Sequence, residues 1–192
     1  MPDIQAAQSA VPLPSAELNL GGTSTSEKQF LSAAASGGVA AGSPCQCRIP
    51  GSNVLKNRQF SVRIAGRVTG GTTTNFTVKV YYGNSTTIGS NTSLATTGAI
   101  AVNSASGQFF LELICSWDAT SQKIGGVFYG WVNATAVAQV VLSNLPTAVD
   151  LSTEAVLTTA SGTQPVLTVT GTFSAGNAAN VAFVDQFEVL PM

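Results

Sequence analysis

Large apolar and polar residues alternate along the chain from residue 60 onward. In the first such stretch the apolar side chains are Phe60, Val62, Ile64 and Val68, and the polar ones are Ser61, Arg63, Arg67 and Thr69. A period of two places the apolar set on one face of an extended chain, so this stretch predicts a half-buried β-strand. Residues 76–82 repeat the pattern after a turn marked by Gly70 and Gly71.

Six further stretches have the same strand character. They cover residues 99–102, 109–117, 123–132, 136–142, 166–173 and 181–189. About eight strands in roughly 130 residues, with almost no helical periodicity, predict an all-β fold: an antiparallel β-sandwich of jelly-roll type. An immunoglobulin-like sandwich is the alternative, although the Cys, Trp, Cys spacing of immunoglobulin domains is absent.

The first 56 residues differ in composition from the rest. Ala, Ser, Gly and Pro dominate and large apolar residues are sparse, so this segment cannot build a core of its own. We expect residues 1–56 to form an extended N-terminal arm and residues 57–192 to form the sandwich. The capping-box spacing of Ser24 and Glu27 predicts one short helix near residues 25–36.

Charge is scarce along the whole chain. Charged residues make up 9% of it, and eight basic and nine acidic residues give a net charge of -1. Such a chain lacks the basic field that binds phosphates or anionic lipids, so nucleic acid and membrane surfaces are poor candidate partners. Low charge also favours association, so we expect partners to cover much of the surface. Residues 1–5 lack the features of a secretory signal, and we expect synthesis and assembly in the cytoplasm.

Catalytic chemistry has few candidate residues. The chain contains no histidine, which excludes a Ser-His-Asp or Cys-His site within it. For Glu112, Asp185 and Glu188, which fall in predicted strands, a solvated charge is the simplest interpretation. Arg63, Arg67 and Lys79 fit either ion pairs or, more simply, a solvated face. Three cysteines, two of them in Cys45-x-Cys47, are too few for a usual zinc site. We therefore expect that the chain is not an enzyme and that it binds neither a metal ion nor another cofactor.

Aromatic side chains suggest a second kind of site. Sugar-binding sandwiches use exposed Trp and Tyr side chains as flat platforms, and the predicted strands contain Tyr81, Tyr82, Trp117, Tyr129 and Trp131. Trp117 and Trp131 continue apolar stripes, so packing in the core is the interpretation we favour for both.

Five segments of the predicted sandwich have distinctive amino-acid sequences as well as the strand pattern. They are FSVRIAGRVTGG from Phe60, NFTVKVYYG from Asn75, FLEL from Phe110, WDATSQKIGG from Trp117 and TVTGTFSAGNAAN from Thr168. Together they resemble β-sandwich virion proteins of tailed bacteriophages, which are often capsid decoration, cement or minor structural proteins. The resemblance spans residues 58–189 and does not cover the arm.

The resemblance implies a jelly-roll fold, oligomers that are commonly trimeric, and a place on the capsid exterior. We therefore expect a structural virion protein that binds and stabilises a phage capsid, with the major capsid protein and neighbouring copies of itself as partners. The arm would be the tether, and its larger apolar residues are the candidate contacts: Ile4, Val11, Leu13, Leu18, Leu20, Phe30 and Leu31. Packing of these residues onto the chain's own sandwich is the alternative for the arm. A carbohydrate- or receptor-binding module of a phage tail or fibre is the alternative function.

Overall fold

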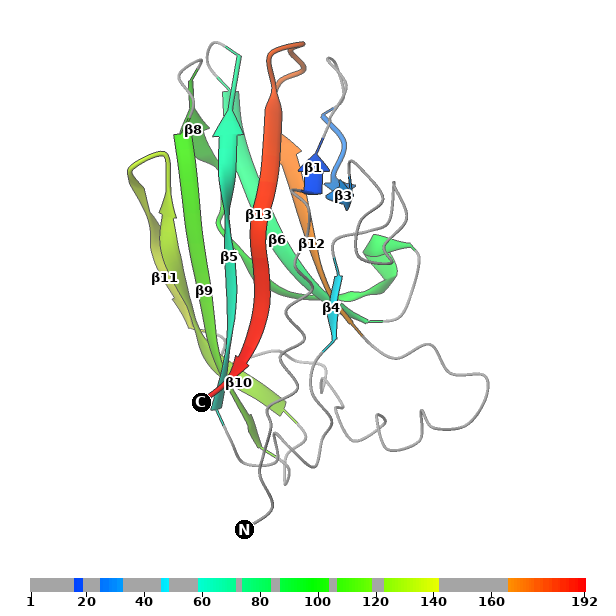
Figure 1. Ribbon diagram of the computed structural model, residues 1–192, viewed down its shortest axis with the longest axis vertical. Helices are drawn as coiled ribbons and strands as arrows, with labels where there is room; N and C mark the ends of the chain where they lie inside the picture. Colours follow the sequence, from blue (N-terminus) through cyan, green and yellow to red (C-terminus); the bar gives the residue numbers. More distant parts are fainter. Residues whose placement is uncertain are drawn as a thin grey trace.

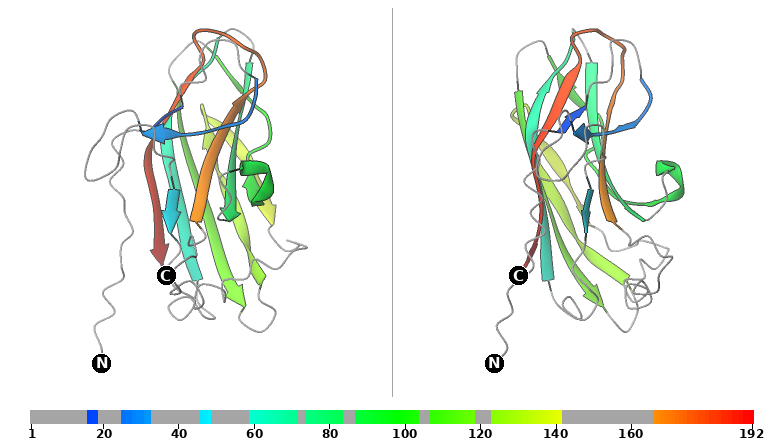
Figure 2. Two further views of the ribbon diagram at one scale, coloured as in Figure 1. Left: turned by 90° about the vertical axis from the view of Figure 1, so that its right-hand side faces the viewer. Right: turned by 45° about the vertical axis from the view of Figure 1, so that its right-hand side comes forward.

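Two antiparallel β-sheets, packed face to face, make up the computed structural model (Figures 1 and 2). The structure describes residues 16–18, 25–32, 46–48, 59–71, 74–83, 87–103, 107–118, 123–141 and 166–192. Strands dominate these residues, and a short 3-10 turn, η1 (Ile88–Ser90), is the helical element among them. The prediction of an all-β fold is confirmed. No helix in this part of the chain is long and apolar enough to cross a membrane.

One sheet has seven strands in the order β11, β10, β9, β5, β13, β1, β3. Their bounds are β11 (Thr135–Val141), β10 (Lys123–Val132), β9 (Gly107–Asp118), β5 (Gln59–Thr69), β13 (Val181–Pro191), β1 (Ala16–Leu18) and β3 (Leu31–Ser32). The strands β9, β10 and β11 follow one another as neighbours, whereas β5 pairs with β13 from the other end of the chain. The first and last long strands therefore lie side by side in the middle of this sheet (Figure 1).

The other sheet has six strands. Its main path runs through β2 (Lys28–Gln29), β12 (Val166–Phe173), β6 (Thr74–Gly83) and β7 (Thr92–Thr96), while β4 (Gln46–Arg48) also pairs with β12 and β8 (Ile100–Val102) with β6. The connections from β5 to β6 and from β12 to β13 both cross between the sheets. The long pairings of β5 with β13 and of β6 with β12 are therefore nested.

The core lies between the sheets and follows the alternation of the sequence. The seven-stranded sheet contributes Phe60, Val62, Ile64, Leu111, Leu113 and Cys115, and the six-stranded sheet contributes Phe76, Val78, Val80, Leu167, Val169 and Phe173. The rings of Phe76 and Phe173 lie 4.9 Å apart, centre to centre. Burying a side chain of this size contributes about 1.5–3 kcal/mol, so this cluster supplies most of the stability of the fold.

Two connections meet at one end of the sandwich, and Asn180 joins them. Its Oδ1 accepts a hydrogen bond from the Gly71 N–H at 2.7 Å, and its Nδ2 donates to the Ala175 carbonyl at 2.6 Å. A Cβ at Gly71 would lie 2.3 Å from the side chain of Asn177, so the lack of a side chain at residue 71 lets the two connections lie close together. Asn180 itself is buried, with both of its amide groups satisfied.

The described parts of the N-terminal arm add strands to both sheets. The strand β1 pairs with β13, while β2 and β4 pair with β12. Between β2 and β3 the chain crosses from one sheet to the other at Phe30, whose side chain is fully buried in the core. The Phe30 N–H also donates to the carbonyl of Val169, at 3.4 Å. The arm therefore contributes to the core that the sequence assigned to residues 57–192 alone.

The short helix predicted near residues 25–36 is wrong for residues 25–32, which form β2 and β3. Glu27 does not complete a capping box; its carboxylate accepts hydrogen bonds from Lys79 and Thr170. A short isolated helix is marginal because its first turn is costly to form. The open edges of β12 and β13, in contrast, offer unpaired backbone groups that an added strand satisfies.

Candidate binding face

Side chains on the outer face of the seven-stranded sheet form rows across the strands. One row joins Trp131, Phe110, Ala65 and Gln186, from β10, β9, β5 and β13 in turn. The next row, two residues along each strand, joins Tyr129, Glu112, Arg63 and Glu188. Neighbours in a row are one strand spacing apart, about 4.8 Å, so their side chains are within reach of one another.

Arg67 and Asp185 form a bidentate ion pair beside the first row. Nε of Arg67 donates to Oδ2 of Asp185 at 2.8 Å, and Nη2 donates to Oδ1 at 2.9 Å. A bulge in β13 takes Asp185 out of the regular pairing with β5. The Arg67 guanidinium also lies 4.7 Å from the centre of the Phe183 ring. Its hydrogen bond to Asp185 raises the pKa of Arg67. The opposite formal charges of the two side chains cancel.

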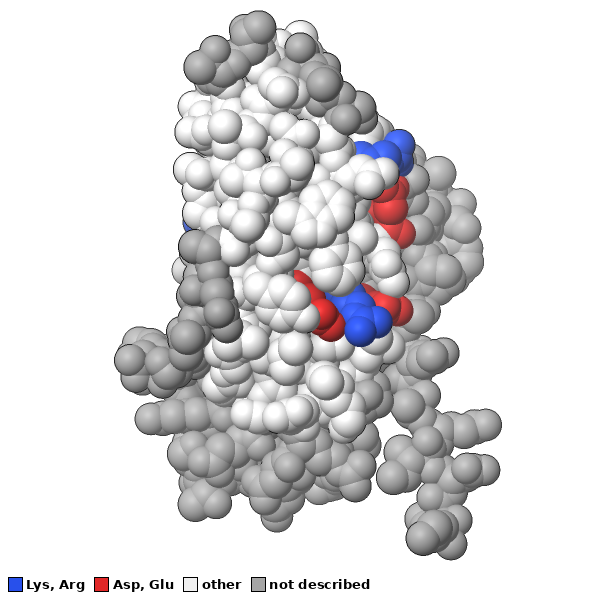
Figure 3. Space-filling view, turned by 90° about the vertical axis from the view of Figure 1, so that its left-hand side faces the viewer, with Lys and Arg blue, Asp and Glu red and all other residues white. Residues whose placement is uncertain are grey.

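Glu112 is the centre of a second group of charged side chains. Nε of Arg63 donates to its Oε1 at 2.9 Å, and the Tyr129 hydroxyl donates to its Oε2. Burial alone would raise the pKa of Glu112, but the hydrogen bonds from Tyr129 and Arg63 outweigh it and hold that pKa below its ordinary value. Only 8% of Glu112 is exposed, so its interpretation as a solvated charge is wrong. Figure 3 shows the charged side chains on one side of the molecule in two small groups, each with both signs.

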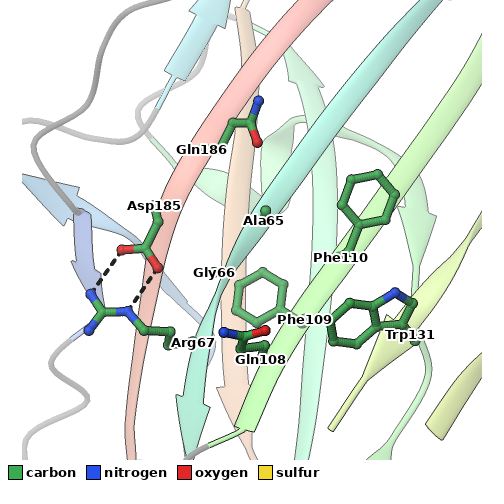
Figure 4. Close-up of a pocket in the computed structure, with 9 residues that line it drawn as sticks. All are labelled: Ala65, Gly66, Arg67, Gln108, Phe109, Phe110, Trp131, Asp185 and Gln186. Atoms are coloured by element: carbon green, nitrogen blue, oxygen red, sulfur yellow. Dashed lines mark hydrogen bonds and ion pairs between the residues drawn. The ribbon is translucent and has the colours of Figure 1, made fainter. Parts of the chain in front are cut away.

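A hollow of about 600 Å³ lies on this face, and we call it the aromatic groove. Its lining residues are Ala65, Gly66, Arg67, Gln108, Phe109, Phe110, Trp131, Asp185 and Gln186. Figure 4 shows Trp131 and Phe110 on one side and the Arg67–Asp185 pair on the other, with Ala65 and Gly66 between them. The groove therefore has an aromatic wall, an ionised but neutral wall and a floor of small residues.

Gly66 lets β5 lie close to β13 and to the Phe109 ring at the floor of the groove. A Cβ at this position would lie 1.9 Å from the carbonyl oxygen of Phe183 and 2.5 Å from the ring of Phe109. Any larger residue would push β5 away from β13 or displace the Phe109 ring from the core. The hollow is therefore built into the packing of the sheet.

Trp131 supplies the most exposed part of the aromatic wall. Its exposed fraction is 40%, so the prediction that it packs in the core is wrong. In β10, Phe128 and Val132 point into the core, and Trp131 takes the opposite face. Next to it, Gly130 has φ 149°, and a Cβ there would lie 2.1 Å from the Phe110 carbonyl oxygen. Gly130 thus lets β10 and β9 approach closely beside the tryptophan.

A third ion pair lies on the six-stranded sheet and holds the arm. Lys79 donates to Glu27 at 2.8 Å, the Thr170 hydroxyl donates to the other carboxylate oxygen at 2.5 Å, and Lys79 is 3.5 Å from the hydroxyl of Tyr81. Burial alone would raise the pKa of Glu27, but the hydrogen bonds from Lys79 and Thr170 outweigh it and lower that pKa. The arm is thus fixed by side chains as well as by strand pairing.

Neither a protein-family model, nor a curated protein, nor a solved structure matches this chain.

The predicted contact residues of the arm fall into three groups. Ile4, Val11, Leu13 and Leu20 lie outside the described residues. Leu18 lies in β1, opposite Ala182 of β13. Phe30 is fully buried, whereas 40% of Leu31 is exposed. The prediction that Phe30 contacts a partner is therefore wrong for the folded chain, and the alternative of packing on the chain's own sandwich holds for it.

Three of the described carboxylates lie in separate ion pairs. Glu27, Glu112 and Asp185 each have their own basic partner, and within the described ranges no three His, Cys, Asp or Glu side chains are close enough to hold a metal ion. Burial raises the pKa of the Cys115 thiol to about 12, so this thiol stays protonated in the core. The arrangement offers binding groups and no activated nucleophile among these residues.

The sequence pointed to Arg67, Trp131 and Asp185 but not to the other groove residues, among them Phe110, Gln108 and Gln186. A usable signal existed for Phe110. A hairpin of the predicted strands 109–117 and 123–132 in which Asp118 pairs with Lys123 places Phe110 opposite Trp131, as observed. No comparable local signal exists for Gln186, because β13 meets β5 only through a pairing that spans most of the chain.

Proposed function

We propose that this chain is a structural virion protein of a tailed bacteriophage, which binds the capsid exterior as a decoration or cement protein. The segments that resemble phage virion proteins fall on β5, β6, β9, β10 and β12, the long strands of both sheets. A two-sheet sandwich with little net charge suits packing against other subunits, because few charged groups lose their water on association.

A jelly-roll arrangement is part of this proposal. It is supported by the nested pairing, in which β5 pairs with β13 and β6 pairs with β12. Such nesting brings the beginning and the end of the chain together, as Greek-key connections do. The meander of β9, β10 and β11 extends the sheet on the far side of β5.

The observation that carries the proposal is the way in which the arm attaches. Its described parts add strands to the edges of β12 and β13, through backbone hydrogen bonds. Adding a strand to a sheet edge is a general mode of attachment, and it serves equally within a chain and between chains. We propose that the rest of the arm, with Ile4, Val11 and Leu13, binds the major capsid protein or a neighbouring copy. Trimeric copies on a capsid would then add their individually weak contacts by avidity.

The test is co-sedimentation with undecorated capsids of the phage whose genome encodes the chain. The full-length protein is compared with a form that lacks residues 1–15, which retains β1 to β4. Removal of residues 1–56 would also remove Phe30 from the core, so that form would confuse loss of folding with loss of binding. We expect the full-length protein to pellet with capsids. The shortened form should bind at least about tenfold more weakly, because it has lost several apolar contacts.

A triple variant, Ile4→Ser, Val11→Ser and Leu13→Ser, tests the proposed contacts without shortening the chain. Met192→Ser is the matched control, because Met192 is an exposed apolar side chain at the other end of the chain. We expect the triple variant to lose binding and the control to keep it. Equal binding by all forms would contradict the tether, and failure of the full-length protein to bind would contradict the capsid function. Sedimentation velocity of the free protein tests the trimer.

A further inference from the structure

We propose that the aromatic groove binds a neutral saccharide. This activity goes beyond capsid binding and does not depend on it, because the groove lies on the sheet face and not on the arm. The formal charges in the groove lining balance one another. Arg67 and Asp185 cancel each other on one wall, and the other polar lining groups, Gln108 and Gln186, are neutral amides. A phosphate, a sulfate or a carboxylate would find no unpaired cation in this lining.

The groove lining keeps both hydrogen-bond donors and hydrogen-bond acceptors available for a ligand. Arg67 uses Nε and Nη2 for Asp185, so Nη1 remains as a donor, and each carboxylate oxygen of Asp185 retains a lone pair. The Gln186 amide donates to Glu188 at 2.7 Å, which leaves its oxygen as an acceptor. Donors and acceptors therefore lie side by side without net charge. Hydroxyl groups both donate and accept, so a sugar with several hydroxyls fits this lining.

The aromatic wall of the groove offers a flat surface to a sugar ring. Trp131 is 40% exposed and lies opposite Phe110 in the pairing of β10 with β9. A flat aromatic side chain can pack against the C–H face of a sugar ring while the hydroxyls of that ring reach the polar wall. In Figure 4 the two aromatic rings stand across the small floor from the Arg67–Asp185 pair, which is the arrangement that such a ligand requires.

The size and the rigidity of the groove also suit a small saccharide. The groove has a volume of about 600 Å³, which lies within the range of small-ligand sites. From Phe110 on β9 to Asp185 on β13 the groove crosses two strand spacings, about 10 Å. Its walls stand on paired strands, and the ion pair already fixes Arg67, so little ordering cost remains for binding. A nucleobase would also stack on Trp131, but Arg67, the basic residue of this lining, is already paired with Asp185 and leaves no free cation for a phosphate.

Isothermal titration of the full-length protein tests the proposal. The probes are six neutral disaccharides: lactose, maltose, cellobiose, mannobiose, melibiose and N,N′-diacetylchitobiose. We expect at least one to bind with a millimolar or lower Kd, and Trp131→Ala to weaken that binding about tenfold or more, in line with loss of a stacked aromatic contact. Trp131→Phe keeps a flat ring and should retain most of the affinity.

Leu31→Ala is the matched control. Leu31 is as exposed as Trp131 and belongs to the same sheet, but it lies outside the groove. We expect this variant to bind as the original chain does. Because both side chains are exposed, neither change should lower the unfolding temperature by more than about 2 °C.

Asp185→Asn tests the neutrality of the groove, with digalacturonate as the probe. Removing the carboxylate leaves Arg67 unpaired, so this variant should bind the anionic disaccharide whereas the original chain should not. The proposal is overturned if none of the six neutral disaccharides binds, if Trp131→Ala binds as well as the original chain, or if the original chain prefers digalacturonate. It is also overturned if Trp131→Ala changes the sedimentation coefficient without changing sugar binding, because the face would then be a subunit interface.

Discussion

Asn180 shows how one buried amide closes an end of the sandwich. The connection that leaves β5 and the connection that enters β13 come together there, and the Asn180 side chain bonds to a backbone group of each. The amide oxygen of Asn180 accepts from Gly71 and its nitrogen donates to Ala175. Gly71 is buried, so water cannot replace its bond, and loss of the amide leaves the Gly71 N–H unsatisfied. Ala175 is exposed, so water can take the place of the amide at its carbonyl.

We expect Asn180→Ala to lower the free energy of unfolding by about 2 kcal/mol, mainly the cost of leaving the buried Gly71 N–H without a partner. Urea unfolding followed by circular dichroism measures the change. Asn177→Ala is the matched control: its amide oxygen accepts from Ala179, but it is exposed, so water can take its place. The control should cost about 1 kcal/mol or less. Equal losses in the two variants would show that Asn180 does not hold the connections together.

Single residues of the candidate site were harder to place from the sequence than the strands that carry them. The strand β10 is apolar on both faces, with Phe128 and Val132 on one and Val127 and Trp131 on the other, so its period of two cannot decide which face is inside. Only the packing of the second sheet decides it. In the same way, the pairing of Glu112 with Arg63 requires β9 and β5 to be neighbours, and no local pattern contains that information.

At the scale of elements, Phe30 links the arm to the core. It lies between β2, which belongs to the six-stranded sheet, and β3, which belongs to the seven-stranded sheet. The arm therefore closes one side of the sandwich and covers the edges of β12 and β13, which would otherwise expose unpaired backbone groups. This position explains why so polar a segment contributes to the core: one large apolar side chain and strand pairing suffice.

We expect Phe30→Ala to lower the free energy of unfolding by about 3–5 kcal/mol, because it removes a fully buried ring and leaves a cavity. The next residue provides the matched control. Leu31 is exposed, so Leu31→Ala should change the free energy of unfolding by no more than about 0.5 kcal/mol. Chemical unfolding of both variants measures the difference. If Phe30→Ala is as mild as Leu31→Ala, the arm does not pack into the core of its own chain.

The strands of the sandwich could be predicted from the sequence, but those of the arm could not. Alternation over 60–69 or 166–173 is a local signal, and β5 and β12 lie where it predicts them. The strands β1 to β4 are two or three residues long, too short for any period to be visible. They exist because β12 and β13 offer an edge, which is a property of the folded sheets. The order of strands likewise depends on long-range pairing.

At the scale of the whole molecule, the titratable groups predict a plateau of stability. The chain has no histidine, so no side chain with an ordinary pKa near 6.5 titrates in the middle of the pH range. On the acid side, Glu27 and Glu112 have a lowered pKa in the folded chain because of their hydrogen bonds and ion pairs. On the alkaline side, burial raises the pKa of Cys115 to about 12.

These shifts fix the direction of the pH dependence. A carboxylate with a lowered pKa contributes stability above its unfolded value, about 4.3, and loses it as the pH falls through the folded pKa. A thiol with a raised pKa contributes stability below its unfolded value, about 8.5, and loses it as the pH rises toward the folded pKa. Differential scanning calorimetry should therefore show an unfolding temperature that is nearly constant from about pH 5.5 to 8 and falls on both sides.

Two variants separate the limbs of that curve. Glu112→Gln removes one of the acids with a lowered pKa, so the unfolding temperature should fall less steeply below about pH 4.5, although the variant is less stable on the plateau. Cys115→Ala removes the buried thiol and should flatten the alkaline limb without changing the acid one. A steep change near pH 6.5 in the original chain would contradict the argument, since only a group absent from this sequence ordinarily titrates there. An acid limb that Glu112→Gln leaves unchanged would mean that the bonds from Arg63 and Tyr129 do not stabilise the folded carboxylate.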